Sequence, residues 1–182
     1  MIIAGTGHRP DKLGGYDPHT TRRVIDFAIY TLDHFKPSLV ISGMAQGWDM
    51  ALAQAAINLN IPFHAYVPFA GQEQVWPSAT RLYYHELLKR AELVKICTEG
   101  GYSRAAMQKR NIEMVNACDL LVALWNGSPG GTANCINYAQ FMQRPIVNLY
   151  ANFESGEPIH VQENADRDGN APGFAGLDWL GP

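Results

Sequence analysis

The chain has 182 residues, 47% of them hydrophobic and 17% charged, which suits one globular domain with a core of its own. A formal net charge of −3 disfavours binding to nucleic-acid backbones, so nucleic acid is not an expected partner. The absence of a long apolar stretch and of a secretory signal pattern, together with three distant cysteines, predicts a cytoplasmic protein with reduced thiols and no membrane association.

Six short apolar segments predict β-strands that are buried on both faces of a sheet, because their apolar residues are nearly continuous. They are residues 1–6, 38–43, 61–68, 92–97, 119–125 and 144–150. Helical patterns separate them: one helix starts with Asp17 and Pro18, and the others span residues 47–58, 79–90, 103–117 and 132–142. This alternation predicts an α/β fold, a doubly wound parallel sheet in a three-layer α/β/α domain, with the first strand in its centre.

Residues 1–150 contain all of these elements and form the single predicted domain. Residues 151–182 are rich in Gly, Pro, Asn and Asp. This composition predicts an irregular C-terminal tail, held by Trp179 and Leu180, rather than a second domain.

Four polar or glycine-rich segments follow predicted strands, at the carboxyl edge where parallel sheets bind ligands. They are GTGHRP (5–10), SGMAQGWD (42–49), CTEGGYSRAAMQKRN (97–111) and NGSPGGTAN (126–134). We expect them to converge on one site. The SGMAQGWD segment is neither a GxGxxG fingerprint nor a P-loop, which disfavours a nicotinamide dehydrogenase and an ordinary NTPase.

The NGSPGGTAN segment has the features of a phosphate cradle. Gly130 and Gly131 let the main chain approach an anion, and Thr132 is the expected cap of a helix whose N-terminus favours negative charge. A glycine turn before a capped helix fits the same residues, and the pattern alone does not decide. Asp49 likewise either stabilises the first turn of its helix or binds a ribose hydroxyl.

Three arginines add positive charge to these loops. Arg9, Arg104 and Arg110 are either solvated surface residues or donors of charge-assisted bonds to phosphate. His8 follows the first strand, where a structural hydrogen bond fits at least as well as acid–base chemistry.

Aromatic residues within or next to these segments either stack on a base or belong to the core; they are Trp48, Tyr102 and Trp125. The histidines outside these loops lack metal-ligand spacing, so we expect no metal, and no cofactor is expected either.

Three segments in chain order, TGHRPDKLGGY, SGMAQGWDMALAQAA and RNIEMVNACDLLVALWNGSPGGTANCINYA, closely resemble the YpsA-like family. That family is a branch of the SLOG superfamily of Rossmann-like domains, which also contains the Lonely Guy enzymes and DprA. The resemblance covers about residues 1–150 and implies a Rossmann-like fold with a nucleotide-derived ligand. It maps ligand binding onto Gly5, Gly7, His8, Arg9, Gly43, Gly47, Asp49, Arg110, Gly130, Gly131 and Thr132.

The sequence departs from the Lonely Guy pattern PGGxGTxxE, whose glutamate assists cleavage of an N-glycosidic bond. The loop is shorter here, and Cys135 stands three residues after Thr132. A thiol does not replace a carboxylate beside an oxocarbenium-like centre. The expected function is therefore binding of a nucleotide or ADP-ribose-like ligand by a sensor, regulator or sequestering protein. The alternative is a nucleoside 5′-monophosphate N-glycosidase that uses Asp49, Glu157 or Glu163, which leaves enzymatic activity open.

Two further expectations concern partners. Binding of single-stranded DNA, as in DprA, is disfavoured by the acidic pI and the lack of a basic, aromatic groove pattern. Related SLOG proteins commonly self-associate, which implies a homodimer or a higher homo-oligomer. Candidate exposed apolar residues for that contact are Leu82, Leu87, Ile136 and Phe141.

Overall fold

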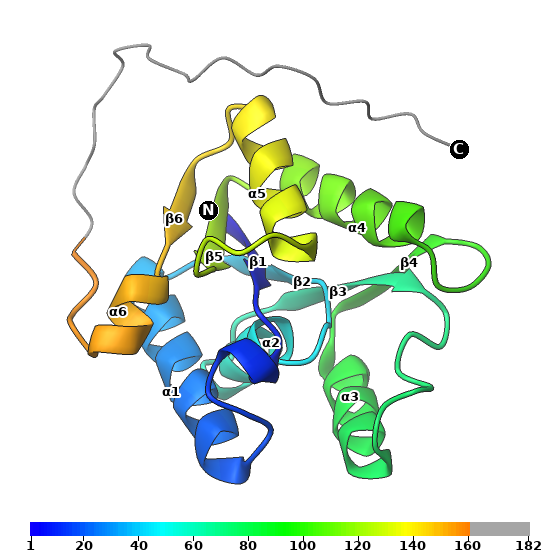
Figure 1. Ribbon diagram of the computed structural model, residues 1–182, viewed down its shortest axis with the longest axis horizontal. Coiled ribbons are helices and arrows are strands. Elements are labelled where there is room, and N and C mark those ends of the chain that lie inside the picture. Colours follow the sequence, from blue (N-terminus) through cyan, green and yellow to red (C-terminus); the bar gives the residue numbers. More distant parts are fainter. Residues whose placement is uncertain (161–182) are drawn as a thin grey trace.

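The computed structural model describes residues 1–160, in which strands and helices alternate (Figure 1). The elements are β1 (Ile2–Gly7), η1 (Pro10–Lys12), α1 (Pro18–Phe35), β2 (Leu39–Ser42), α2 (Trp48–Asn58), β3 (Phe63–Phe69), α3 (Ser78–Arg90), β4 (Leu93–Thr98), α4 (Arg104–Ala117), β5 (Leu120–Leu124), α5 (Gly131–Phe141), β6 (Ile146–Asn148) and α6 (Tyr150–Ser155). The predicted strands and helices are all present, with most bounds shifted by one or two residues.

The described strands form one parallel sheet in the order β4-β3-β2-β1-β5-β6, which confirms the predicted fold class. β1 is central, as expected, and its Ile3 is fully buried. Figure 1 shows α1, α2 and α3 on one face of the sheet and α4 and α5 on the other. The chain therefore changes face after β4, and the strand order reverses between β1 and β5. In open α/β sheets such a reversal creates the ligand crevice.

Each face of the sheet is covered by its own hydrophobic cluster, one centred on α1 and α2 and the other on α4 and α5. α1 begins as its sequence predicts, because the Asp17 carboxylate accepts a hydrogen bond from the Thr20 amide at 2.9 Å and Pro18 occupies the first helical position. These two layers fix the ends of the strands, and with them the loops that form the site.

Three details of the fold differ from the expectations. α5 begins at Gly131 with Gly130 as its N-cap, so Thr132 lies inside the helix and does not cap it. Leu87 and Ile136 are buried in the core, since the helix faces that carry them pack inward, so neither is a surface residue available for self-association. Leu82 and Phe141 are exposed.

The third difference is at the start of the predicted tail, where residues 150–155 form α6. Phe153 of this helix is buried, and the Arg23 guanidinium lies 4.0 Å above its ring. Trp179 and Leu180 lie outside the described residues, so their role in holding the tail stays a prediction. Within residues 1–160 no helix has the length and hydropathy needed to cross a membrane.

Candidate functional site

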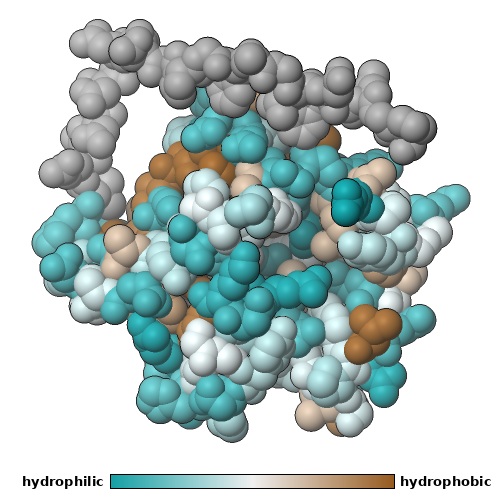
Figure 2. Space-filling model, in the orientation of Figure 1, coloured by the Kyte–Doolittle hydropathy of each residue, from teal (hydrophilic) through white to brown (hydrophobic). Residues whose placement is uncertain are grey.

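A cavity of about 520 Å³ lies at the carboxyl edge of the sheet, beside the loops that follow the neighbouring strands β1 and β5. All four predicted loops contribute to its wall, the segment 42–49 through Ala45 and Asp49. Figure 2 shows mostly hydrophilic residues around a central hollow on the face onto which these loops open. Of the predicted site residues, the wall contains Gly7, His8, Arg9, Asp49, Arg104, Arg110, Gly130, Gly131 and Thr132.

The other three predicted residues, Gly5, Gly43 and Gly47, do not line the cavity. A Cβ atom on Gly5 would overlap Leu52, and one on Gly47 would overlap the His8 carbonyl. A Cβ on Gly43 would displace the Arg110 guanidinium. These glycines are thus accounted for by close packing behind the site, and direct contact of any of them with a ligand stays a prediction.

The N-terminus of α5 opens into the cavity without a side-chain cap. Gly130 has a φ of 145°, a conformation that favours glycine, and no side chain accepts from the first helical N–H groups. A Cβ at Gly131 would meet nothing within 4 Å, so the protein leaves open space beside these donors. The arrangement can hold an anion through main-chain N–H groups.

The Thr132 hydroxyl has a different role from the one predicted. It donates to the Gly7 carbonyl at 3.0 Å, which ties α5 to the end of β1. Since that bond uses its one hydroxyl hydrogen, Thr132 offers an anion only its main-chain N–H.

Asp49 and Arg110 form a buried ion pair on the opposite wall, with Nη1 of Arg110 3.4 Å from Oδ2 of Asp49. Nη1 also donates to the Gly43 carbonyl. Burial raises the pKa of Asp49 to about 6, although the charge of Arg110 acts in the opposite direction. Near neutral pH Asp49 is therefore mostly ionised and accepts hydrogen bonds.

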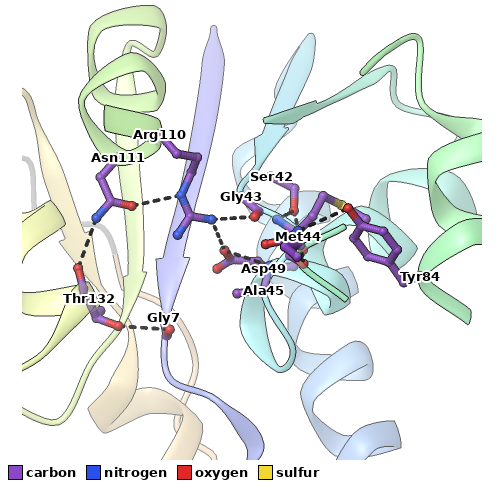
Figure 3. Close-up of polar contacts among 12 residues, drawn as sticks. Gly7, Ser42, Gly43, Met44, Ala45, Asp49, Tyr84, Arg110, Asn111 and Thr132 are labelled. Carbon is purple, nitrogen blue, oxygen red and sulfur yellow. Dashed lines mark hydrogen bonds and ion pairs between the residues drawn. The ribbon is translucent and has the colours of Figure 1, made fainter. Parts of the chain in front are cut away.

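Asn111 continues this network and was not among the predicted site residues. Its Oδ1 accepts from Nε of Arg110 at 3.0 Å, and its Nδ2 donates to the Gly131 carbonyl at 3.3 Å (Figure 3). The only sequence signal for Asn111 was its position directly after Arg110 in a predicted helix. A hydrogen bond to a loop 20 residues away leaves no local pattern.

His8 is buried beside Asn126, and burial lowers its pKa. Its Nε2 lies 3.0 Å from the main-chain nitrogen of Asn126, from which it accepts, and 2.7 Å from Oδ1 of that residue. These contacts hold the loop after β5 against β1. The neutral ring therefore has a structural role, in agreement with the first of the two alternatives, and its contact with a ligand stays a prediction.

The remaining cations of the cavity differ in how they are held. Among the described residues, the side chains of Arg9 and Arg104 form no hydrogen bond or ion pair, whereas Lys12 donates to the Ser128 hydroxyl at 2.7 Å. Nε2 of Gln108 is buried in the cavity wall without a partner in the described chain. A buried donor of this kind costs about 1–3 kcal/mol until an acceptor reaches it.

Only one of the three candidate aromatic residues lines the cavity. Tyr102 is 73% exposed at its rim. Trp48 is fully buried in the core, and Nε1 of Trp125 donates to the Ser128 carbonyl at 2.7 Å. Core packing therefore accounts for Trp48, and Tyr102 remains the candidate for stacking on a base.

Cys135 is fully buried in the cluster between α4 and α5, and burial raises its pKa to about 12. Its thiol does not line the cavity and does not ionise at neutral pH. Asp11 and Asp49 are the carboxylates of the cavity wall within residues 1–160. Glu157 is outside that wall, and Glu163 lies beyond the described part of the chain.

Two other features of residues 1–160 bear on ligand type. No group of three or more His, Cys, Asp or Glu residues there is arranged to hold a metal ion. A second cavity of about 260 Å³ between α1, α2 and α3 is lined by uncharged residues. The larger cavity is thus the candidate site for an anionic ligand.

Comparison with known families supports the resemblance seen in the sequence. The model of the family described as the YspA SLOG family (YpsA) matches residues 3–148. The uncharacterized SPbeta prophage-derived protein YoqJ of Bacillus subtilis (strain 168) is 32% identical, and the match covers 62% of this chain and 77% of that protein.

Solved structures with similar folds are more distant in sequence. DNA processing protein A (DprA) from Helicobacter pylori, described with a single-stranded DNA binding mode, has a TM-score of 0.57 at 17% identity, over 87% of this chain and 74% of that one. The DprA of Streptococcus pneumoniae has a TM-score of 0.55 at 18% identity. The match covers 79% of this chain and 48% of DprA, so this chain spans about half the length of that protein.

The molybdenum cofactor carrier protein of Chlamydomonas reinhardtii has a TM-score of 0.52 at 15% identity, over 85% of this chain and 80% of that one. Identities this low show a shared fold only. One of these structures is of a protein described with a single-stranded DNA binding mode, so the comparisons give no support to the expectation that nucleic acid is not a partner.

Proposed function

Because the chain belongs to the YpsA family of SLOG proteins, we propose that its cavity binds a nucleotide or an ADP-ribose-like ligand. In this proposal the protein acts as a sensor, a regulator or a sequestering protein. The twelve predicted site residues are divided between contact with the ligand and support of the loops that make this contact.

The observation that carries the proposal is the uncapped N-terminus of α5. Its first N–H groups face a cavity, Gly131 leaves space beside them, and Arg9 offers a cation without a partner in the described chain. A phosphate would satisfy these donors and interact favourably with the helix dipole.

Asp49 is suited to the sugar part of such a ligand. It is an ionised acceptor near neutral pH, and it lines the same cavity as the α5 N-terminus. Sugar hydroxyls are donors, whereas a phosphate would be repelled by the carboxylate. We therefore place the phosphate at Gly131 and a ribose hydroxyl at Asp49, with Tyr102 available for the base.

The second candidate function is hydrolysis of the N-glycosidic bond of a nucleoside 5′-monophosphate. Asp49 favours it because a carboxyl group with a pKa of about 6 can exchange a proton near neutral pH. The position that carries glutamate in Lonely Guy enzymes is occupied by the buried Cys135, so Asp49 would have to act alone or with Asp11.

Calorimetric titration with AMP and ADP-ribose, with chromatography for released adenine, tests both candidates. We expect binding without adenine release, and at least about tenfold weaker binding by Gly131→Val. Gly101→Val is the matched control, because a Cβ there also meets nothing and Gly101 does not line the cavity. Adenine release would favour the hydrolase. If neither compound binds, or if Gly131→Val binds like the parent protein, the cradle is wrong.

A further inference from the structure

Two loops that are distant in sequence meet through one helix in the candidate site. Asp49 belongs to the segment after β2, and Gly131 belongs to the segment after β5. Within residues 1–160, no hydrogen bond or ion pair joins these two residues directly. Arg110 and Asn111 of α4 lie between them and contact both (Figure 3).

Arg110 is held on two sides. Its Nη1 contacts the Asp49 carboxylate and the Gly43 carbonyl, and its Nε donates to Asn111. The residue is 6% exposed, so its orientation depends on these contacts. Figure 3 shows the second terminal nitrogen pointing toward Gly7, where α5 is tied to β1. A fixed guanidinium with one free end is a pre-organised anion donor.

Asn111 holds the other end of the arrangement. Its amide accepts from Arg110 and donates to the Gly131 carbonyl, so it uses both halves of its side chain. The residue is 4% exposed, and replacing it would leave buried donors and acceptors without partners. The carbonyl that it holds belongs to the first residue of α5. Asn111 therefore sets the direction of the N–H groups that face the cavity.

We propose that Arg110 and Asn111 are a positioning pair that couples Asp49 to the Gly131 loop, so that a change at Asp49 alters how this loop binds an anion. The proposal rests on the proposed function in one respect, since it takes the Gly131 loop as the anion site. When Asp49 bonds to a sugar hydroxyl, its hold on Arg110 weakens, and the guanidinium turns toward the anion. Sugar and anion then bind cooperatively.

A double-mutant cycle on sulfate binding tests the pair, since sulfate keeps its charge between about pH 5 and about pH 7.5. The proteins are the parent, Asp49→Asn, Asn111→Leu and the double variant, titrated near pH 7.5. A purely coulombic effect of Asp49 would be the same with and without Asn111, and the changes would be additive. We expect Asp49→Asn to strengthen sulfate binding several-fold in the parent and by less than about twofold in Asn111→Leu.

Asn116→Leu is the matched control. Asn116 lies on the same helix and also bonds to α5, through the Tyr138 hydroxyl at 3.1 Å, but it does not line the cavity. We expect it to leave both sulfate affinity and the effect of Asp49→Asn unchanged. If Asn111→Leu does not fold, Arg110→Lys replaces it, because lysine keeps the charge and loses the bond from Nε.

The pH profile gives a second readout that a merely structural role would not change. The charged or titratable groups near Asp49 are Arg110, Arg9 and the Cys135 thiol, and His8 also lines the cavity. His8 is present in every variant and gains charge on acidification. The pH dependence of sulfate binding by Asp49→Asn therefore measures the contribution of His8 without that of Asp49. We expect the part of the pH effect that depends on Asp49 to shrink in Asn111→Leu and to persist in Asn116→Leu.

Additive effects in the cycle, or an unchanged pH profile in Asn111→Leu, would overturn the positioning pair. If the parent protein binds no sulfate, the anion site of the proposed function is wrong. The same four proteins are then compared by urea unfolding. Non-additive free energies of unfolding between the non-contacting Asp49 and Asn111 would support the pair, and additive ones would overturn it.

Discussion

Replacing Asp49 by asparagine should change how stability depends on pH, with a sign set by burial. Burial raises the pKa of this carboxyl group from 3.8 to about 6 in the folded protein, so between these values the folded state binds more protons than the unfolded state. Stability from the protonated form is fully present below pH 3.8 and is lost as pH rises to about 6 and above. One pKa unit corresponds to 1.36 kcal/mol, which gives about 3 kcal/mol in all and about 2 kcal/mol between pH 4 and pH 7.

Urea unfolding of the parent protein and Asp49→Asn at several pH values measures this directly. Between pH 4 and pH 7 the free energy of unfolding of the variant should rise by about 2 kcal/mol relative to that of the parent. Loss of the ion pair adds only an offset that does not depend on pH. Asp17→Asn is the control with the opposite sign, because hydrogen bonds from Thr20 lower the pKa of Asp17 and its carboxylate stabilises the fold as pH rises. A difference between Asp49→Asn and the parent that does not vary with pH would refute the raised pKa of the buried Asp49 carboxyl group.

Three other results follow from the described residues. Burial raises the pKa of Cys97 and Cys135 to about 12, so a thiol reagent at mildly alkaline pH should modify them only after unfolding, and rapid labelling of the native protein would contradict this burial. Thr132→Val should lower the free energy of unfolding by about 1 kcal/mol, through its lost bond to β1, and leave sulfate binding nearly unchanged; a large loss of binding would return the hydroxyl to the anion site. If the predicted self-association uses the exposed Leu82 or Phe141, light scattering of a serine variant should show a smaller mass, and an unchanged mass would exclude the residue tested.

The fold was predictable because its pattern is local. The near-continuous apolar strands and the helices between them are recognised from residues that are close in sequence. A parallel sheet needs this alternation of strands and helices. The cap of α1 followed from Asp17 and Pro18 in the same way. The start of α5 was misplaced because Thr132 is the better cap by type, whereas the close contact of its hydroxyl with Gly7 draws it into the helix. Tertiary contacts decided that boundary.

The convergence of the loops that form the candidate site was predictable, but the contacts of its residues were predictable only in part. Four loops at one sheet edge must converge, whatever their residues do. The role of a residue depends on partners distant in sequence. Gly5 faces Leu52, Gly47 faces His8, and Asn111 reaches Gly131, and none of these pairs leaves a spacing that a single sequence reveals. A glycine required for close packing cannot be distinguished in the sequence from a glycine that contacts a ligand until its spatial neighbours are known.

The choice between binding and hydrolysis depends on the state of one carboxyl group. A general acid must be protonated at the working pH, and Asp49, with a pKa of about 6, is mostly ionised at pH 7. In that state it can accept hydrogen bonds or act as a base. Its oxygen is also committed to Arg110, which lowers its basicity and fixes its direction. An ionised carboxylate across the cavity from an uncapped helix N-terminus discriminates between hydroxyls and phosphates, which is what a binding protein for a phosphorylated sugar needs. A hydrolase would need in addition a group to stabilise the developing positive charge on the sugar, and the position expected to supply it is Cys135, buried and neutral.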